Sequence, residues 1–219
     1  DERQAITEVH EAGHAVLLIA LTKNIPELVL SVTSDTEASG FLFSKDEREF
    51  TSKNDILLKT AILLGGLVAE EIIFGENYVT AGASTDILKA TSAISSLYKE
   101  HGFGKVPIAY ATNTEASEEH KYHQASQIEE EIKAIILKSK VLANETLKRE
   151  MKLLLAIASQ LSNVAAIRKE ELVELIKVHS NITELDCGTD NYYRNRLQKF
   201  ISSNGIVTES ISRSLQIVR

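Results

Sequence analysis

The sequence contains a single cysteine, Cys187, and therefore forms neither an intrachain disulfide nor a zinc site built from several cysteines. Only two prolines, Pro26 and Pro107, interrupt a chain rich in Leu, Ile, Ala, Glu and Lys, and no tryptophan is present. This composition disfavours long strands and a sandwich of many short ones. No apolar run is long enough to cross a bilayer, since runs such as residues 60–69 soon end at acidic side chains.

The net charge of the chain excludes another set of functions. At −7, with a pI near 5.5, the chain has no general electrostatic attraction for nucleic acid or for anionic lipid. Hydrophobic residues make up 43% of the 219 residues, which is enough to bury a sizeable core. We therefore expect a globular, mainly α protein that does not bind nucleic acid.

The most informative pattern in the sequence is His10-Glu11-Ala12-Gly13-His14, within an apolar-periodic run from Ile6 to Leu21. On a helix, residues four apart lie on the same face, so both imidazoles can bind one metal ion from one side. Glu11 lies beside this pair, where its carboxylate can take a proton from a water molecule on the metal. The pattern is typical of a zinc hydrolase.

The alternative interpretation is that His10 and His14 are ordinary core residues. Both fall within the apolar stripe of the helix, and a single buried histidine is usually satisfied by a carbonyl oxygen. Two such residues at this spacing, with a glutamate between them, are better explained by a metal ion. Gly13 also indicates a close neighbour, because glycine within a helix costs about 1 kcal/mol relative to alanine.

A catalytic zinc site needs a third protein ligand, and nothing close to His14 in the sequence supplies one. Asp86, Glu70, Glu71 and Asp55 are all candidates. Asp86 stands in the first turn of a helix expected over residues 84–100, where an acidic side chain also complements the helix dipole without any metal. Spacing alone leaves the choice open.

The four remaining histidines are weaker candidates for metal binding. His120 and His123 are three residues apart, but they lie among Glu and Lys residues typical of a solvated helix face, and His101 and His179 each stand alone. We predict no second zinc site.

Hydrophobic periodicity predicts the remaining elements. Leu28, Leu30 and Val32 alternate as in a strand, and residues 39–43 form a second strand that pairs with it through a turn. A role of this edge in binding extended peptides and ordinary hairpin packing are both consistent with the sequence. Helices are expected over residues 51–74, 84–100 and 168–179 and near Tyr192–Ile201. Two long amphipathic helices are expected after Ser117. A linker is expected over residues 180–188 and a polar tail over 202–219.

Three segments resemble the peptidase domain of the FtsH family of ATP-dependent zinc metalloproteases, in order and in separation. They are His10–Ala15, Gly65–Gly75 with the sequence GGLVAEEIIFG, and Thr80–Ile87 with the sequence TAGASTDI. The resemblance covers roughly residues 1–175. It implies that His10, His14 and Asp86 hold Zn²⁺ and that Glu11 is the general base.

The resemblance also implies a biochemical role. We expect a zinc metalloendopeptidase that hydrolyses unfolded or flexible protein segments, delivered by an AAA+ ATPase module within a homo-oligomeric, hexameric ring. No G-x-x-x-x-G-K-[ST] phosphate loop occurs in these residues, so this chain does not itself hydrolyse ATP by that mechanism.

Three further expectations concern organisation and location. The fold class is mainly α, a helical metallopeptidase domain with a small β-hairpin or sheet near the active site and a C-terminal helical bundle. Residues 1–178 form the zinc peptidase domain, and residues 179–219 form a helical appendage and tail to which neither composition nor resemblance assigns a role. We expect this chain to be soluble and to face the cytoplasm. A membrane anchor in the full-length protein is compatible with this expectation.

Two other functional interpretations stay open at this point. One is a degenerate relative that keeps the fold and serves as a regulatory or scaffold subunit, against which the intact set of His10, Glu11, His14 and Asp86 argues. The other is a helical interaction module in which the histidine motif is a coincidence, which predicts no bound metal.

Overall fold

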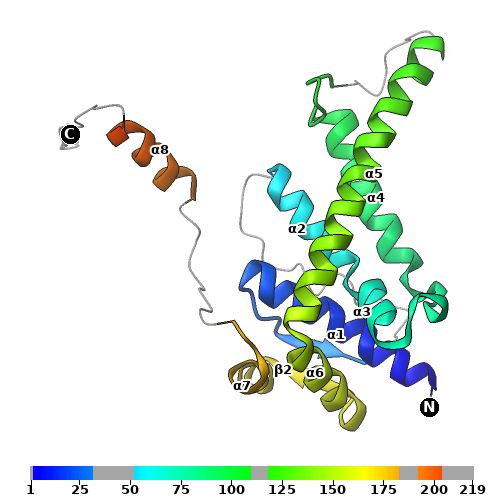
Figure 1. Ribbon diagram of the computed structural model, residues 1–219, viewed down its shortest axis with the longest axis vertical. Helices are drawn as coiled ribbons and strands as arrows, with labels where there is room; N and C mark the ends of the chain where they lie inside the picture. The colour runs from blue at the N-terminus through cyan, green and yellow to red at the C-terminus, as the bar shows by residue number, and fades with distance from the viewer. Residues whose placement is uncertain (1, 32–51, 110–117, 183–191, 204–219) are drawn as a thin grey trace, which may run out of the picture. The chain divides into compact units, whose positions relative to one another are not determined.

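The computed structural model describes residues 2–31, 52–109, 118–182 and 192–203 (Figure 1). In these residues the chain is mainly helical, which confirms the predicted fold class. The chain divides into two compact units, Asp1–Leu185 and Asp186–Arg219. No described helix is both long enough and apolar enough to cross a bilayer.

The first unit contains seven α-helices and two short strands in its described residues. They are α1 (Glu2–Thr22), β1 (Leu28–Leu30), α2 (Lys53–Leu63), α3 (Gly65–Phe74), α4 (Ser84–Glu100), α5 (Glu118–Arg149), α6 (Met151–Asn163), β2 (Ala166–Arg168) and α7 (Lys169–His179). Two single-turn 3₁₀ helices, Glu76–Tyr78 and Ala81–Ala83, connect α3 to α4. In the second unit the structure describes α8 (Tyr192–Ser203).

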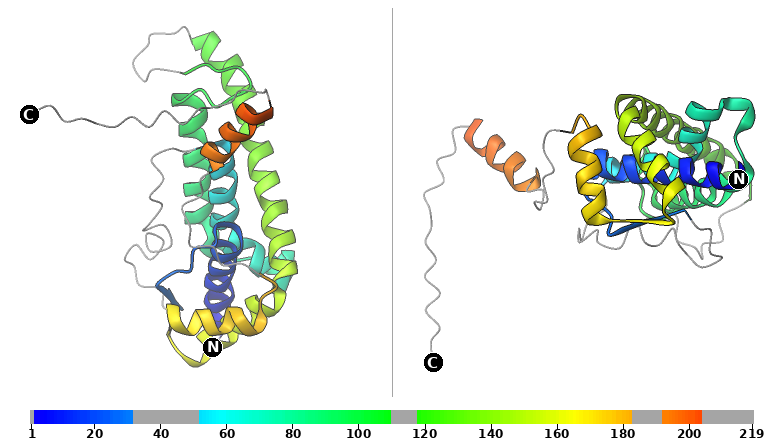
Figure 2. Two further views of the ribbon diagram at one scale, coloured as in Figure 1. Left: turned by 90° about the vertical axis from the view of Figure 1, so that its left-hand side faces the viewer. Right: turned by 90° about the horizontal axis from the view of Figure 1, so that it is seen from below.

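Helix α1 lies at the centre of the first unit and packs against α3, α6, α2 and α5 (Figure 2). Its apolar side chains Leu17 and Ile19 are fully buried, and so are Leu154 and Ile157 of α6 in the same cluster. Each such side chain stabilises the fold by about 1.5–3 kcal/mol relative to exposure. The helix that carries both motif histidines is therefore held on several sides by the core.

The contact between α1 and α3 is unusually close because glycines meet there. A Cβ atom added to Gly13 would lie 2.7 Å from the Cβ of Ala69 and would overlap the carbonyl oxygen of Gly65. A Cβ added to Gly65 would in turn lie 3.0 Å from the carbonyl oxygen of Gly13. The close neighbour that Gly13 indicates in the sequence is thus α3.

The prediction of one continuous helix over residues 51–74 is wrong at Leu64, where the structure has a break between α2 and α3. Leu64 has φ −82° and ψ 0°, which departs from α-helical geometry at this one residue. Two glycines follow directly, and their low helix propensity favours a break. The start is as predicted, because Ser52 and Asp55 form a reciprocal capping box at the first turn of α2.

The strand predicted at Leu28 is present and is short. It pairs antiparallel with β2, with Val29 opposite Ile167, and both of these side chains are buried. The second predicted strand, residues 39–43, lies outside the described residues. The sequence did not reveal β2, because this three-residue strand depends on a partner more than 130 residues earlier in the chain.

The helices predicted over 84–100, 168–179 and near Tyr192 correspond to α4, α7 and α8, and the two long helices to α5 and α6. After α7 the chain stays attached to the first unit through Glu150, which is 1% exposed. Its carboxylate accepts hydrogen bonds from the Ser180 hydroxyl at 2.8 Å and from the Asn181 backbone at 3.0 Å. The predicted functional division at residue 178 stays a prediction.

We expect Gly13→Ala to lower the free energy of unfolding by about 2 kcal/mol, since overlap with the α3 backbone outweighs the gain of about 1 kcal/mol that alanine brings to a helix. Urea denaturation in the presence of a chelator measures this without any contribution from bound metal. Ser92→Ala, at an exposed position of α4, is the control and should change stability by less than about 0.5 kcal/mol. Equal stability of the Gly13 variant and the control would show that α1 and α3 tolerate a wider separation.

Candidate metal centre

The structure brings His10 and His14 of α1 together with Asp86 in the first turn of α4. The two Nε2 atoms are 3.1 Å apart, and the Oδ2 atom of Asp86 lies 3.2 Å from that of His10 and 3.3 Å from that of His14. These three atoms form a nearly equilateral triangle. A tetrahedral ion with ligand bonds of about 2.0–2.1 Å separates its ligand atoms by about 3.3 Å, so the triangle matches one face of such a site.

Each histidine ring is oriented by an acceptor on its other nitrogen. The Nδ1 atom of His14 lies 2.7 Å from the carbonyl oxygen of Ile62, and that of His10 lies 2.8 Å from the carboxylate of Glu70. Since a carbonyl or carboxylate oxygen only accepts, both Nδ1 atoms donate, and in the neutral rings the Nε2 atoms carry lone pairs. Two lone pairs and a carboxylate oxygen thus point at one position, which fits a cation.

Electrostatics at the centre favour positive charge on the ring of His10 and negative charge on Asp86. Burial alone would lower the pKa of His10, but hydrogen bonds with Asp86 and Glu70, together with the negative charges of Glu11 and Asp86, raise it above 6.5. Burial alone would raise the pKa of Asp86, but its hydrogen bonds with both histidines lower it far below the usual range. Asp86 is therefore an anion across the physiological pH range.

Glu70 contacts the Nδ1 atom of His10, the ring nitrogen that does not face Asp86. Its side chain is 0% exposed, and its second carboxylate oxygen accepts a hydrogen bond from the backbone of Thr80 at 2.8 Å. One carboxylate of α3 therefore connects the ring of His10 to the segment that leads to Asp86. Gly66, one turn before Glu70, leaves the space for this ring, since a Cβ atom there would overlap it.

The other two acidic candidates from the sequence lie elsewhere. Glu71 pairs with Lys140 of α5 at 2.6 Å, and Asp55 caps the first turn of α2. Among the four acidic candidates, Asp86 is the one that the structure brings to both Nε2 atoms. Sequence reasoning considered Glu70 as a ligand and missed its contact with the far side of His10.

Glu11 follows His10 on α1 and is half-buried beside the centre. Burial raises the pKa of its carboxyl group, while the charges of His14 and His10 oppose that effect. A carboxylate with a raised pKa is a stronger proton acceptor, which suits a general base. The structure therefore places the predicted base next to the predicted ligands.

Of the weaker histidine candidates, His101 and His179, whose side chains the structure describes, do not join this centre. His101 caps the C-terminus of α4 and is exposed, and His179 ends α7. The side chains of His120 and His123 lie outside the described residues. Elsewhere in the described part of the chain, no three His, Cys, Asp or Glu side chains converge as they do here.

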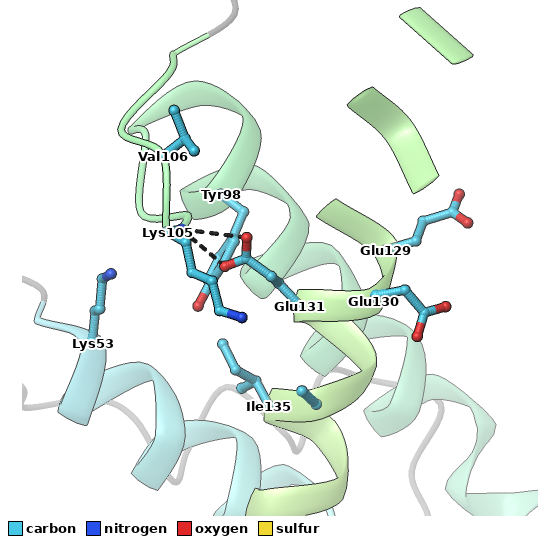
Figure 3. Close-up of a pocket in the computed structure, with 9 residues that line it drawn as sticks. Lys53, Tyr98, Lys105, Val106, Glu129, Glu130, Glu131 and Ile135 are labelled. Carbon is cyan, nitrogen blue, oxygen red and sulfur yellow. Dashed lines mark hydrogen bonds between the residues drawn. The ribbon is translucent and has the colours of Figure 1, made fainter. Parts of the chain in front are cut away.

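A separate pocket of about 730 Å³ lies near the opposite end of α4 from Asp86 (Figure 3). The carboxylate of Glu131 accepts the backbone N–H of Lys105 there, at 3.0 Å to its nearer oxygen. Burial raises the pKa of Tyr98 in the pocket, and the charge of Glu131 adds to this effect. The pocket contains none of the metal-centre residues, and it is lined by Lys53, Tyr98, Lys105, Val106, Glu129, Glu130, Glu131, Ala134 and Ile135.

Comparison with known proteins agrees with the resemblance found in the sequence. The sequence model of peptidase family M41 matches residues 1–175. Proteins described as ATP-dependent zinc metalloprotease FtsH are also similar. The protein from Chloroflexus aggregans is 30% identical over 81% of this chain, and that from Endomicrobium trichonymphae is 31% identical over 81%.

A third relative with the same description, from Mesoplasma florum, is 31% identical over 82% of this chain. The matched region makes up 29% to 30% of the length of these three proteins. The chain thus spans less than a third of the curated relatives it matches.

We expect Glu70→Gln to weaken the binding of Zn²⁺ by about 10- to 100-fold, because the variant loses the charged acceptor that orients His10. Competition against a chromophoric chelator measures the affinity. Glu71→Gln is the matched control, since the same change one residue later affects a side chain that contacts Lys140 instead. If both variants bind Zn²⁺ as tightly as the unmodified chain, Glu70 has no part in positioning the ring.

Proposed function

The chain belongs to peptidase family M41, and from this premise we propose that it is a zinc metalloendopeptidase of the FtsH type. The observation that carries the proposal is the triangle formed by His10, His14 and Asp86, with Glu11 beside it. Two imidazole nitrogens and one carboxylate oxygen form a ligand set that suits Zn²⁺ and leaves a fourth position open. The relatives, which are described as zinc metalloproteases, agree with this assignment.

In this proposal His10, His14 and Asp86 are the metal ligands and Glu11 is the catalytic base. A zinc ion held there would act as a Lewis acid on the scissile carbonyl and would make water nucleophilic near neutral pH. Glu11 removes the proton from the attacking water and passes it to the amine of the leaving peptide. Glu70 and the Ile62 carbonyl keep the two rings in the tautomer that directs Nε2 toward the metal.

We propose unfolded or flexible protein segments as substrates, as the family resemblance implies. The relatives are described as ATP-dependent. We therefore propose that an AAA+ ATPase module delivers substrate in the full-length protein and that the assembly is a homo-oligomer, hexameric as the family resemblance implies. The competing role is a degenerate subunit that keeps the fold without activity.

We expect Asp86→Asn to weaken Zn²⁺ binding by more than about 100-fold, which exceeds the effect of removing an outer hydrogen-bond partner. The comparison variant is Asp55→Asn, which alters another acidic candidate at the first turn of a helix. It should retain Zn²⁺ with little change in affinity. Tight binding by the Asp86 variant would remove Asp86 from the ligand set.

We expect Glu11→Gln to abolish peptide cleavage while Zn²⁺ stays bound, because loss of a general base lowers the rate by about 10²- to 10⁴-fold. The assay uses a library of short flexible peptides, which need no unfolding motor, with the metal content of each variant measured in parallel. Glu71→Gln is the activity control.

Four results of this assay separate the interpretations, and cleavage retained by Glu11→Gln would remove Glu11 from the role of general base. Cleavage by the unmodified chain and by Glu71→Gln, but not by Glu11→Gln, supports the proposed peptidase. Bound Zn²⁺ without cleavage in an assembled oligomer favours the degenerate subunit. If the chain binds no Zn²⁺ at all, the result favours a helical interaction module in which the histidine motif is a coincidence.

A further inference from the structure

The C-terminal helix α8 differs in charge from the rest of the chain. The protein as a whole carries 31 Asp and Glu against 24 Lys and Arg residues. From residue 191 onward, the sequence has five Lys and Arg residues and one Glu. Helix α8 contains Arg194, Arg196 and Lys199 and no acidic residue. The general exclusion of anionic partners by net charge therefore does not apply to this segment.

Helix α8 is also amphipathic. Tyr193, Leu197 and Phe200 are 60%, 60% and 53% exposed, at the spacing that places them on one face. Ile201 continues the same stripe and is half-buried. The family match ends at residue 175, so α8 is not part of the matched peptidase region.

The two arginines border the apolar stripe. At about 100° per residue, Arg194 and Arg196 lie on opposite edges, each about 80° from the centre of the stripe. The guanidinium of Arg196 lies over the ring of Phe200, 4.9 Å from its centroid. Lys199 and the uncharged polar side chains occupy the rest of the helix. When the stripe lies on a flat surface, both arginines reach that surface.

The size of the stripe favours a lipid surface over a protein groove. Its exposed side chains would bury roughly 300 Å² together, whereas a specific protein interface buries about 800 Å² per partner. A bilayer surface needs no complementary groove, and it attracts the apolar stripe and the basic edges at the same time. We propose that α8 binds in the plane of an anionic lipid surface, with Tyr193, Leu197 and Phe200 toward the acyl chains and Arg194 and Arg196 at the phosphates.

The test is co-sedimentation of the full chain with vesicles of phosphatidylcholine containing phosphatidylserine, compared with phosphatidylcholine alone. Each basic side chain near an anionic surface contributes about a fivefold gain in partitioning. We expect Arg194→Gln/Arg196→Gln to lower binding to the anionic vesicles by roughly 25-fold. Added salt should weaken the binding of the unmodified chain.

Two further variants sharpen the test. Leu197→Gln/Phe200→Gln keeps every charge and a good helix former at both sites, and it should lower binding at least tenfold, because the apolar contact is lost. Lys138→Gln/Lys148→Gln removes two exposed lysines from α5 and is the matched control for the arginine variant. The control should bind the anionic vesicles as the unmodified chain does.

Binding that both α8 variants lose and the lysine control keeps would support the proposal. The proposal is overturned by no binding to anionic vesicles, by equal binding to neutral ones, or by equal losses in the arginine variant and the control. Full binding by the Leu197 and Phe200 variant would also overturn it, since the attraction would be purely electrostatic. Self-association that this variant abolishes, without vesicle binding, would identify a second copy of the chain as the partner instead.

Discussion

The close backbone contact between α1 and α3 is the constraint on which the metal centre depends. Gly13 and Gly65 allow these helices to approach until a side chain at either position would overlap the other backbone. At that separation the carboxylate of Glu70 reaches the Nδ1 atom of His10 and the backbone of Thr80. One helix contact thus sets both the ring orientation and the path of the chain toward Asp86.

Much of this arrangement follows from local pattern. The spacing of apolar residues predicted α1, α4, α6 and α7, and the spacing of His10 and His14 placed both rings on one helix face. The assignment of Asp86 needed more than spacing, because an acidic residue in a first helical turn is common without a metal. Its place beside both rings depends on how α4 packs, and no local pattern encodes that packing.

Two of the features that the sequence did not reveal, strand β2 and the break between α2 and α3, depend on tertiary or backbone context. Strand β2 exists because Ile167 pairs with Val29, a residue distant in the sequence. The break at Leu64 follows from glycines that a periodicity argument treats as tolerable within a helix. The break also contributes to the site, because the carbonyl of Ile62 lies in the last turn of α2. There it accepts the Nδ1 proton of His14 in addition to the backbone N–H of Leu64.

The hydrogen bonds that Glu70 and the Ile62 carbonyl make with the two histidine rings hold the site in shape without the ion. In small zinc-dependent domains the metal supplies much of the folding free energy, and a chelator unfolds them. Here α1, which carries the two proposed histidine ligands, is fixed by the main apolar core, and α4, which carries Asp86, is held by a second buried cluster that includes Ile94 and Tyr98. Both rings are oriented by oxygen atoms of the protein itself. If His10, His14 and Asp86 hold the metal as proposed, we expect the protein without metal to stay folded, with a proton in place of the ion on His10, and to exchange the metal without a refolding step.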